Sequence, residues 1–230
     1  MQLKFSPSTN IVRDTDKEIN YIVTPNSKEV FNNIINNLKS GNKVFNLIGS
    51  YGTGKSTFLW ALQQNLSQNN EYFVKLNGQF NGIHKFEFIK LIGDSKPLSE
   101  ALLHTLDFKN ENPHEIAIEK LNEFYINKCK KRGKFLFIII DEFGKFLEYA
   151  AKGNLEKELY FIQQLAEYVN DESKNDDSRV IASFASSTPF AVSPLITKPN
   201  SLASAIAACI ASEPPLSILI IFAPLAPNSL

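Results

Sequence analysis

Short apolar runs alternate with amphipathic helical patterns along most of this chain. Apolar residues three and four positions apart predict helices over 26–41, 55–66, 98–106, 114–130 and 155–169. Apolar runs bounded by turn residues predict strands over 43–49, 71–76, 135–140 and 179–185. The apolar cluster at 86–92 has a weaker pattern, and we expect it to form a short helix.

The segment FLFIII at 135–140 is apolar at every position and is bounded by Gly133 and Gly144. Such an unbroken run is typical of a strand that is buried on both faces of a sheet. Because strands alternate with helices, we expect a mostly parallel sheet with helices on both sides. The sequence therefore predicts an α/β fold built as a three-layer sandwich.

A glycine-rich stretch, GSYGTGKST, separates the strand at 43–49 from the helix that follows it. It fits the pattern G-x-x-x-x-G-K-[ST], between a strand and a helix, which is the context of a phosphate-binding loop. Bare glycine backbone lets amide groups approach phosphates closely, and the N-terminus of the next helix favours negative charge. The residues expected to bind a nucleotide are Gly49, Ser50, Tyr51, Gly52, Thr53, Gly54, Lys55, Ser56 and Thr57. Lys55 is placed to reach the outer phosphates, and the Ser56 hydroxyl is placed to ligate Mg²⁺.

Two acids, Asp141 and Glu142, close the apolar run at 135–140. Alone, such a pair often marks only a solvated strand end, but downstream of a phosphate-binding loop it has a chemical use. A carboxylate on a neighbouring strand can hold Mg²⁺, and hydrolysis needs a base for the attacking water. We therefore expect Asp141 to serve the metal. Glu142, at the point where the strand has ended, is expected to be catalytic together with Lys55.

These segments together resemble the N-terminal ATPase module of large bacterial P-loop ATPases of the AAA-like and STAND-like group, often found in defence or DNA-handling systems. The resemblance covers about residues 20–170 and rests on YIVTPNSKEVF, GSYGTGKSTFLWAL, IIIDEFGKFLEYAA and LYFIQQLAEYVN. It implies a P-loop NTPase fold, ATP and Mg²⁺ as cofactors, a Walker A motif at 49–57 and a Walker B motif ending at Asp141 and Glu142. It also implies that residues 21–25 lie near the adenine.

The chain departs from that group after its last predicted strand. The polar residues available as a sensor at the end of this strand are Ser186, Ser187 and Thr188. The arginines of the chain are Arg13, Arg132 and Arg179, so none follows the sensor position as an arginine finger would. Nucleotide binding is therefore better supported than hydrolysis. The alternatives to an ATPase domain are a truncated nucleotide-binding remnant or interaction module without turnover and, less favoured because arginine is scarce, a small-molecule kinase.

The composition changes abruptly near residue 181. All ten glycines and all but two of the charged residues precede it, whereas seven of the 11 prolines follow it. Three interpretations of the tail stay open: a membrane-associated segment around LSILIIFAPLA, an aggregation-prone linker, and an out-of-frame translation product, which would leave the sheet incomplete. We expect a loose lead-in over 1–20, a P-loop ATPase domain over 21–184 and an Ala/Ser/Pro-rich tail over 185–230.

The 24 basic and 24 acidic residues give a net charge of zero, so overall charge indicates neither a nucleic-acid nor a membrane partner. The stretch KCKKRGK at 128–134 either touches nucleic-acid phosphates or is a solvated helix end whose cations favour the helix dipole. Two separated cysteines, three dispersed histidines and no secretory signal argue against a disulfide scaffold or a zinc site and predict a cytoplasmic protein. The expected partners are a nucleotide, ATP rather than GTP since no Asn-Lys-x-Asp stretch occurs, and further copies of the chain or a larger complex.

Overall fold

The computed structural model describes residues 9–39, 41–67, 72–73, 85–109, 112–153, 155–170, 179–186 and 219–222. Its helices are α1 (Pro25–Lys39), α2 (Lys55–Leu66), α3 (Leu98–Thr105), α4 (Pro113–Phe124), α5 (Phe143–Lys152) and α6 (Leu155–Asn170). Its strands are β1 (Val44–Ile48), β2 (Phe86–Ile92), β3 (Phe135–Asp141), β4 (Val180–Ser186) and β5 (Leu219–Phe222). A π-helical turn (Tyr125–Cys129) and a 3₁₀ turn (Lys130–Arg132) extend α4 as far as Gly133.

The five strands form one sheet in the order β2-β3-β4-β1-β5. The first four strands in this order are parallel, and β5 pairs antiparallel with β1. Each parallel neighbour is reached through at least one helix, which is the crossover that parallel pairing requires. The predicted α/β fold with a mostly parallel sheet is therefore confirmed.

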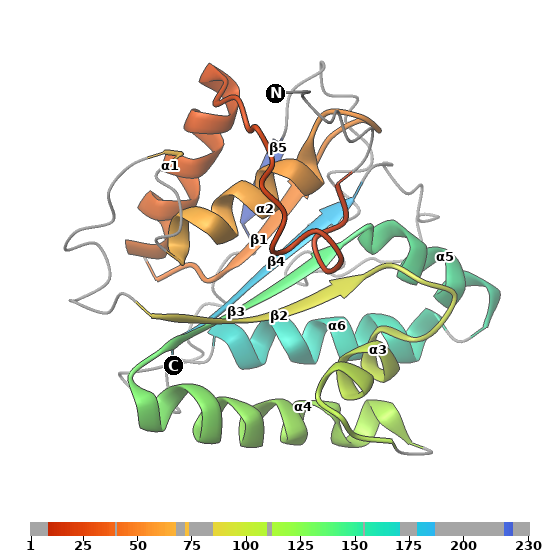
Figure 1. Cartoon of the computed structure of the whole chain (residues 1–230). Coiled ribbons are helices and arrows are strands. Elements are labelled where there is room, and N and C mark those ends of the chain that lie inside the picture. The colour runs from red at the N-terminus through yellow and green to blue at the C-terminus, as the bar shows by residue number, and fades with distance from the viewer. Residues whose placement is uncertain are drawn as a thin grey trace, which may run out of the picture.

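Helices cover both faces of this sheet, as Figure 1 shows, with α1 and α2 on one side and α3 to α6 on the other. The sheet separates two clusters of buried apolar side chains, one under each helical layer. Strand β3 supplies both clusters, because Phe137 and Ile139 face α1 and α2 while Ile138 and Ile140 face the other helices. Burial on both faces explains why this strand is apolar at every position. The layers are those of a P-loop NTPase three-layer sandwich.

Residues 86–92 form strand β2, so the short helix expected there is wrong. All seven residues pair in parallel register with β3, from Phe86 opposite Phe135 to Ile92 opposite Asp141. The Phe86 and Phe135 rings stack with their centroids 5.4 Å apart. Tertiary pairing and these aromatic contacts decide a segment whose own periodicity is weak. The strand expected at 71–76 lies outside the described residues, except for 72 and 73.

Residues 9–15, part of the lead-in expected over residues 1–20, are packed onto the domain. Ile11 is fully buried within the cluster under α1 and α2. The indole Nε1 of Trp60 donates to the Asp14 carbonyl at 3.0 Å, and the hydroxyls of Thr9 and Thr57 lie 3.0 Å apart. Residues 9–15 therefore follow the surface of α2 from its first turn, because one apolar side chain and buried polar partners anchor an otherwise polar stretch.

The tail contributes strand β5 at the edge of the sheet, where residues 219–222 pair with residues 45–48 of β1. Residues 187–218 and 223–230 lie outside the described part of the chain, so the three interpretations of the tail and the domain boundaries stay predictions. Among the described residues, none of the helices has the length and apolar character needed to cross a membrane.

Candidate functional site

The loop between β1 and α2 is shaped by two glycines in the left-handed region of backbone space. Gly52 has a φ of 81° and Gly54, which precedes α2, has a φ of 84°. A Cβ on either residue would meet no heavy atom within 4 Å, so it is the positive φ and not crowding that favours glycine here. This loop ends at the N-terminus of α2, whose unpaired backbone amides attract anions.

Lys55, the first residue of α2, turns its side chain back into this loop. It is buried, with 6% of its surface exposed, and its Nζ donates to the carbonyls of Gly49 and Ser50 at 2.7 Å each. Burial lowers the pKa of the Lys55 ammonium, and the negative charge of Asp141 opposes that shift. The loop thus holds one cation between its bare backbone and the acid at the end of β3.

Asp141, the last residue of β3, lies beside the first turn of α2. Asp141 is 4% exposed, and its carboxylate accepts the Glu142 backbone N–H at 2.9 Å. Burial raises the pKa of Asp141, while the nearby Ser56 hydroxyl, the Glu142 N–H and the Lys55 charge lower it. Two of the residues expected to bind a metal, 85 positions apart in sequence, therefore lie close together.

The paired oxygens of Ser56 and Asp141 suit Mg²⁺, which prefers hard oxygen ligands. The described residues contain no group of three or more His, Cys, Asp or Glu side chains that could hold a metal ion. At nucleotide sites in general, Mg²⁺ is bound by one or two protein oxygens together with phosphate oxygens and water. The donor set fits the ion that the sequence predicts.

Glu142 begins the turn from β3 into α5, as expected from its place after the strand. Its backbone adopts a φ of 51°, and the carbonyl accepts the Lys145 N–H at 2.9 Å to start the helix. The Glu142 side chain is 38% exposed and forms an ion pair with the Lys145 ammonium. A left-handed backbone at a non-glycine residue re-aims the side chain relative to the strand. Glu142 therefore points away from the buried sheet while Asp141 remains inside it.

The end of β4 lies between the loop after β1 and the acids after β3, because β4 is inserted between these strands. Its last residue, Ser186, pairs in register with Ile48, directly before the glycine-rich loop. A sensor at Ser186 therefore has the right place in the sheet, whereas Ser187 and Thr188 lie outside the described residues. Arg179 lies at the opposite end of the same strand.

Gly93 is a residue of this site that sequence reasoning missed. It follows β2 directly, and its N–H donates to the Asp141 carbonyl at 2.8 Å. A Cβ on Gly93 would lie 2.0 Å from the Glu142 carbonyl oxygen and 2.9 Å from Lys145 Cβ. A single glycine after an apolar run hints at such a close approach, but its partner is apparent only in the fold. Through this hydrogen bond and close packing, Gly93 stabilises the turn that contains both acids.

We expect Gly93→Ala to destabilise the domain by about 1–3 kcal/mol, because the new methyl group cannot fit without moving the Glu142 turn or the end of β2. Urea unfolding followed by circular dichroism measures the change. Ser95→Ala, two residues away on the exposed surface, is the control and should stay within about 0.5 kcal/mol of wild type. Equal stability of the two variants would contradict the close approach.

Comparisons with known proteins find similarity to solved structures but not to known sequences. No protein-family model matches the chain, and no match was found among curated proteins. Among solved structures, the chain is similar to C. elegans PCH-2, with a TM-score of 0.45 and 16% sequence identity. The match covers 75% of this chain and 40% of that one, so the chain spans less than half the length of that protein. The fold assignment therefore rests on the sheet order and the layers described above, and the AAA-like or STAND-like family stays a prediction.

Proposed function

We propose that this chain is a nucleotide-binding domain that hydrolyses ATP with the help of Mg²⁺. The observation that carries the proposal is that the buried Asp141 carboxylate lies near both the Ser56 hydroxyl and the Lys55 ammonium, at the N-terminus of α2. A phosphate-binding loop, a cation and an oxygen pair suited to Mg²⁺ come together there from distant parts of the sequence. A glycine-rich turn with a purely structural role would need no buried acid beside its lysine.

Each residue of the site has a role in this proposal. The backbone amides of Gly49–Thr57 wrap the phosphate chain, and Lys55 exchanges its bonds to loop carbonyls for bonds to the outer phosphate oxygens. Ser56 and Asp141 would hold Mg²⁺, which when bound neutralises negative charge on the phosphates. Glu142 orients a water molecule and accepts its proton as the water oxygen bonds to the terminal phosphorus, while the bridging P–O bond breaks and ADP leaves.

Glu142 must leave Lys145 to perform that role. Both side chains are substantially exposed, and exposed ion pairs contribute only about 0–1 kcal/mol. The ion pair therefore presents a low barrier to reorientation of the carboxylate. Glu142, which directly follows the acid proposed to hold Mg²⁺, is thus available as a base. This favours hydrolysis over transfer of phosphate to a small molecule.

The arginines of the chain lie away from the proposed phosphate site or are already paired. Arg132 and Arg179 precede β3 and β4 at the opposite end of the sheet, and the Arg13 guanidinium binds the Asp14 carboxylate at 2.9 Å. A cation that stabilises charge in the transition state would therefore come from another copy of the chain or from a larger assembly. We propose that turnover depends on such association, whereas nucleotide binding does not.

The test of this proposal is the release of phosphate from ATP by the purified full chain, measured across a range of protein concentrations with and without EDTA. We expect Mg²⁺-dependent release whose specific rate rises with protein concentration, because association supplies the missing cation. Binding of Mg·ATP without release at any concentration would instead support the nucleotide-binding remnant. Failure of the folded chain to bind Mg·ATP at all would overturn the proposal.

A further inference from the structure

The starts of the four parallel strands share a chemical feature. Each of β1, β2, β3 and β4 is preceded directly by a basic residue: Lys43, Lys85, Lys134 and Arg179. Because parallel strands begin at the same edge of a sheet, these cations from four distant parts of the sequence lie along one edge. Because the whole chain has a net charge of zero, its overall charge does not indicate this local cluster of cations.

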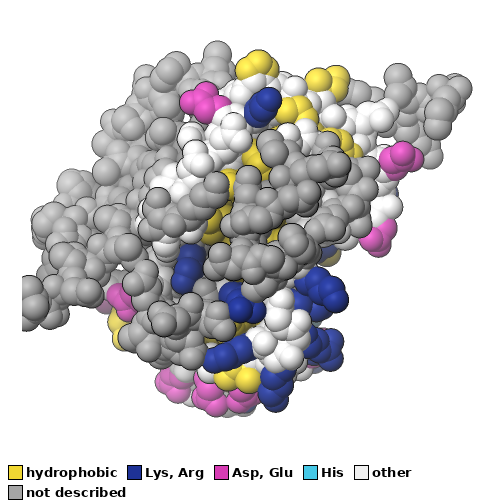
Figure 2. Space-filling view, turned by 90° about the vertical axis from the view of Figure 1, so that its left-hand side faces the viewer, with side chains coloured by type: hydrophobic (Ala, Val, Ile, Leu, Met, Phe, Trp, Pro, Cys, Tyr) yellow, Lys and Arg dark blue, Asp and Glu magenta, His cyan; other side chains and the backbone are white. Residues whose placement is uncertain are grey.

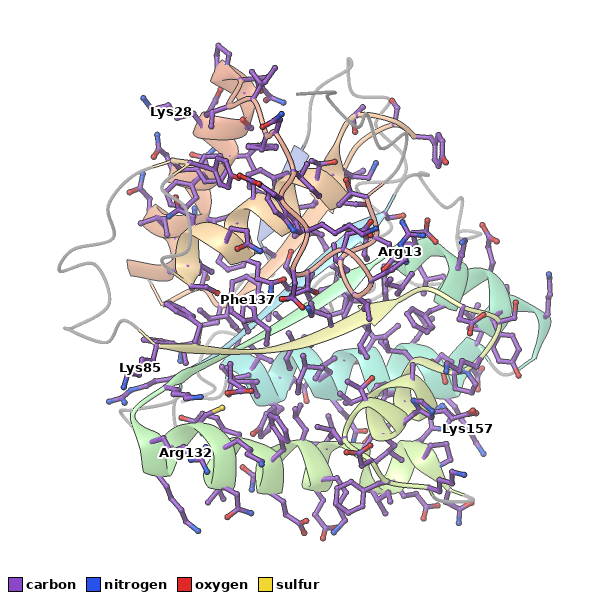
Figure 3. The ribbon with its side chains drawn as sticks, in the orientation of Figure 1. Arg13, Lys28, Lys85, Arg132, Phe137 and Lys157 are labelled. Carbon is purple, nitrogen blue, oxygen red and sulfur yellow. The ribbon has the colours of Figure 1, made fainter. Side chains whose placement is uncertain are left out.

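The turn that leads into β3 adds four further cations to the same edge. Its basic residues, all exposed, are Lys128, Lys130, Lys131 and Arg132. We call these eight side chains the basic edge. Figure 2 shows dark blue side chains gathered over the lower part of this end of the molecule, and Figure 3 places Lys85 and Arg132 there together. The edge combines cations from four strand starts with those of one turn, so it is not a single helix end.

Few carboxylates of the described residues neutralise the basic edge. Glu87 accepts from Lys134 at 2.7 Å, and Glu123 on α4 is engaged with Lys120. The stretch 171–178, outside the described residues, adjoins Arg179 in sequence and contains four carboxylates and one lysine. The eight basic side chains of the edge outnumber these carboxylates.

The basic edge lies at the opposite end of the strands from the nucleotide site. A seven-residue strand such as β3 is about 20 Å long at roughly 3.3 Å per residue. Phosphate groups bound at this edge would therefore not occupy the loop that contains Lys55. A ligand of the edge and a nucleotide can be bound at the same time.

The arrangement of the cations suits an extended ligand with regularly repeated negative charges. Strand starts are about 4.8 Å apart across a sheet, and long lysine and arginine side chains can follow a chain of phosphates over that spacing. Attachment to an anionic membrane also draws on exposed apolar side chains. Of the exposed large apolar residues described, Ile126 alone adjoins this edge in sequence, and it is only 36% exposed. The described part of this surface is therefore mainly polar and charged.

We propose that the basic edge binds the sugar-phosphate backbone of nucleic acid, without sequence preference and independently of the nucleotide site. Backbone contacts by lysine and arginine supply this kind of binding and make it depend steeply on salt. The proposal does not rest on ATP hydrolysis, since the residues involved are at the other end of the sheet.

The test measures fluorescence anisotropy of a labelled random-sequence DNA duplex, about two helical turns long, with the full chain at several salt concentrations. We expect a triple variant, Lys130→Gln with Lys131→Gln and Arg132→Gln, to bind at least tenfold more weakly. Its slope of log affinity against log salt should be shallower by about 2–3, because each lost phosphate contact removes nearly one unit. All three side chains are exposed, so the fold should be retained, which a thermal melt checks.

The matched control removes the same charge elsewhere, through Lys28→Gln with Lys152→Gln and Lys157→Gln on α1, α5 and α6. Figure 3 shows Lys28 and Lys157 far from Lys85 and Arg132. This control, Lys55→Ala and saturating Mg·ATP should each leave duplex binding within about twofold, which separates the edge from the nucleotide site. Absence of binding at low salt, equal weakening by both triple variants, displacement by Mg·ATP, or preference for anionic vesicles over the duplex would overturn the proposal.

Discussion

Glu142→Gln is expected to lower the rate of ATP hydrolysis by about 10²–10⁴-fold, the usual contribution of a general base. The amide keeps the size and shape of the side chain but cannot accept a proton from the attacking water. Affinity for Mg·ATP should stay within a few fold of wild type, because Glu142 is not expected to contact the phosphates. Its side chain is partly exposed and its ion pair with Lys145 is weak, so the fold is also retained.

Single-turnover phosphate release measures the rate, and titration with a fluorescent ATP analogue measures affinity. Glu148→Gln is the matched control, because it makes the same change at an exposed position of the same helix and should leave turnover unchanged. Equal loss of activity in the two variants would indicate a general effect of removing charge from α5. Full activity of Glu142→Gln would exclude Glu142 as the base.

Lys55→Ala is expected to weaken binding of Mg·ATP on the order of a hundredfold or more, since each charged hydrogen bond to phosphate contributes roughly 1.5–3 kcal/mol. The ammonium is held inside the loop by the carbonyls of Gly49 and Ser50, so it is preorganised for an anion that enters there. Burial lowers its pKa, which shows that the fold keeps this charge in a partly desolvated place. Charge in such a place interacts more strongly with phosphate than it would in water.

Isothermal calorimetry with Mg·ATP and a thermal melt separate lost binding from lost fold. Lys145→Ala is the control, because it removes a cation near the same acids but outside the loop, and it should change affinity by less than about threefold. Unchanged affinity of Lys55→Ala, in a chain that melts like wild type, would mean that the glycine-rich loop is not the phosphate site. Turnover could then not be assigned to these residues.

Much of the fold could be predicted from local sequence alone, for reasons visible at particular residues. The run at 135–140 is apolar at every position because both faces of β3 are buried, and Gly133 ends the preceding turn with a φ of 62°. The helices at 26–41 and 155–169 show their period because each has one face against the sheet. A regular pattern of apolar residues indicates that the same faces of an element are buried along its whole length. The predicted ends of these elements therefore lie within a few residues of the observed ends.

Segments whose own apolar pattern is weak owe their structure to contacts with residues far away in sequence. Residues 86–92 form a strand because β3 pairs with all seven of them, although their own pattern is weak. Residues 9–15 are held by Ile11, which enters a core made by α1 and α2, and by Trp60 on α2. The pattern of apolar and polar residues within a short segment cannot predict a contact with a residue that is dozens of positions away in sequence.

The sequence by itself determined that a glycine-rich loop joins a strand to a helix and that two acids follow a buried strand, because spacing and residue type along the chain suffice for both. Only the tertiary structure decided that Ser56 lies near Asp141, that Gly93 packs against the Glu142 backbone, and that four separated cations share one edge. The physical reason is the parallel sheet, which places the ends of strands that are far apart in sequence side by side. Strand order, rather than sequence distance, determines which side chains meet.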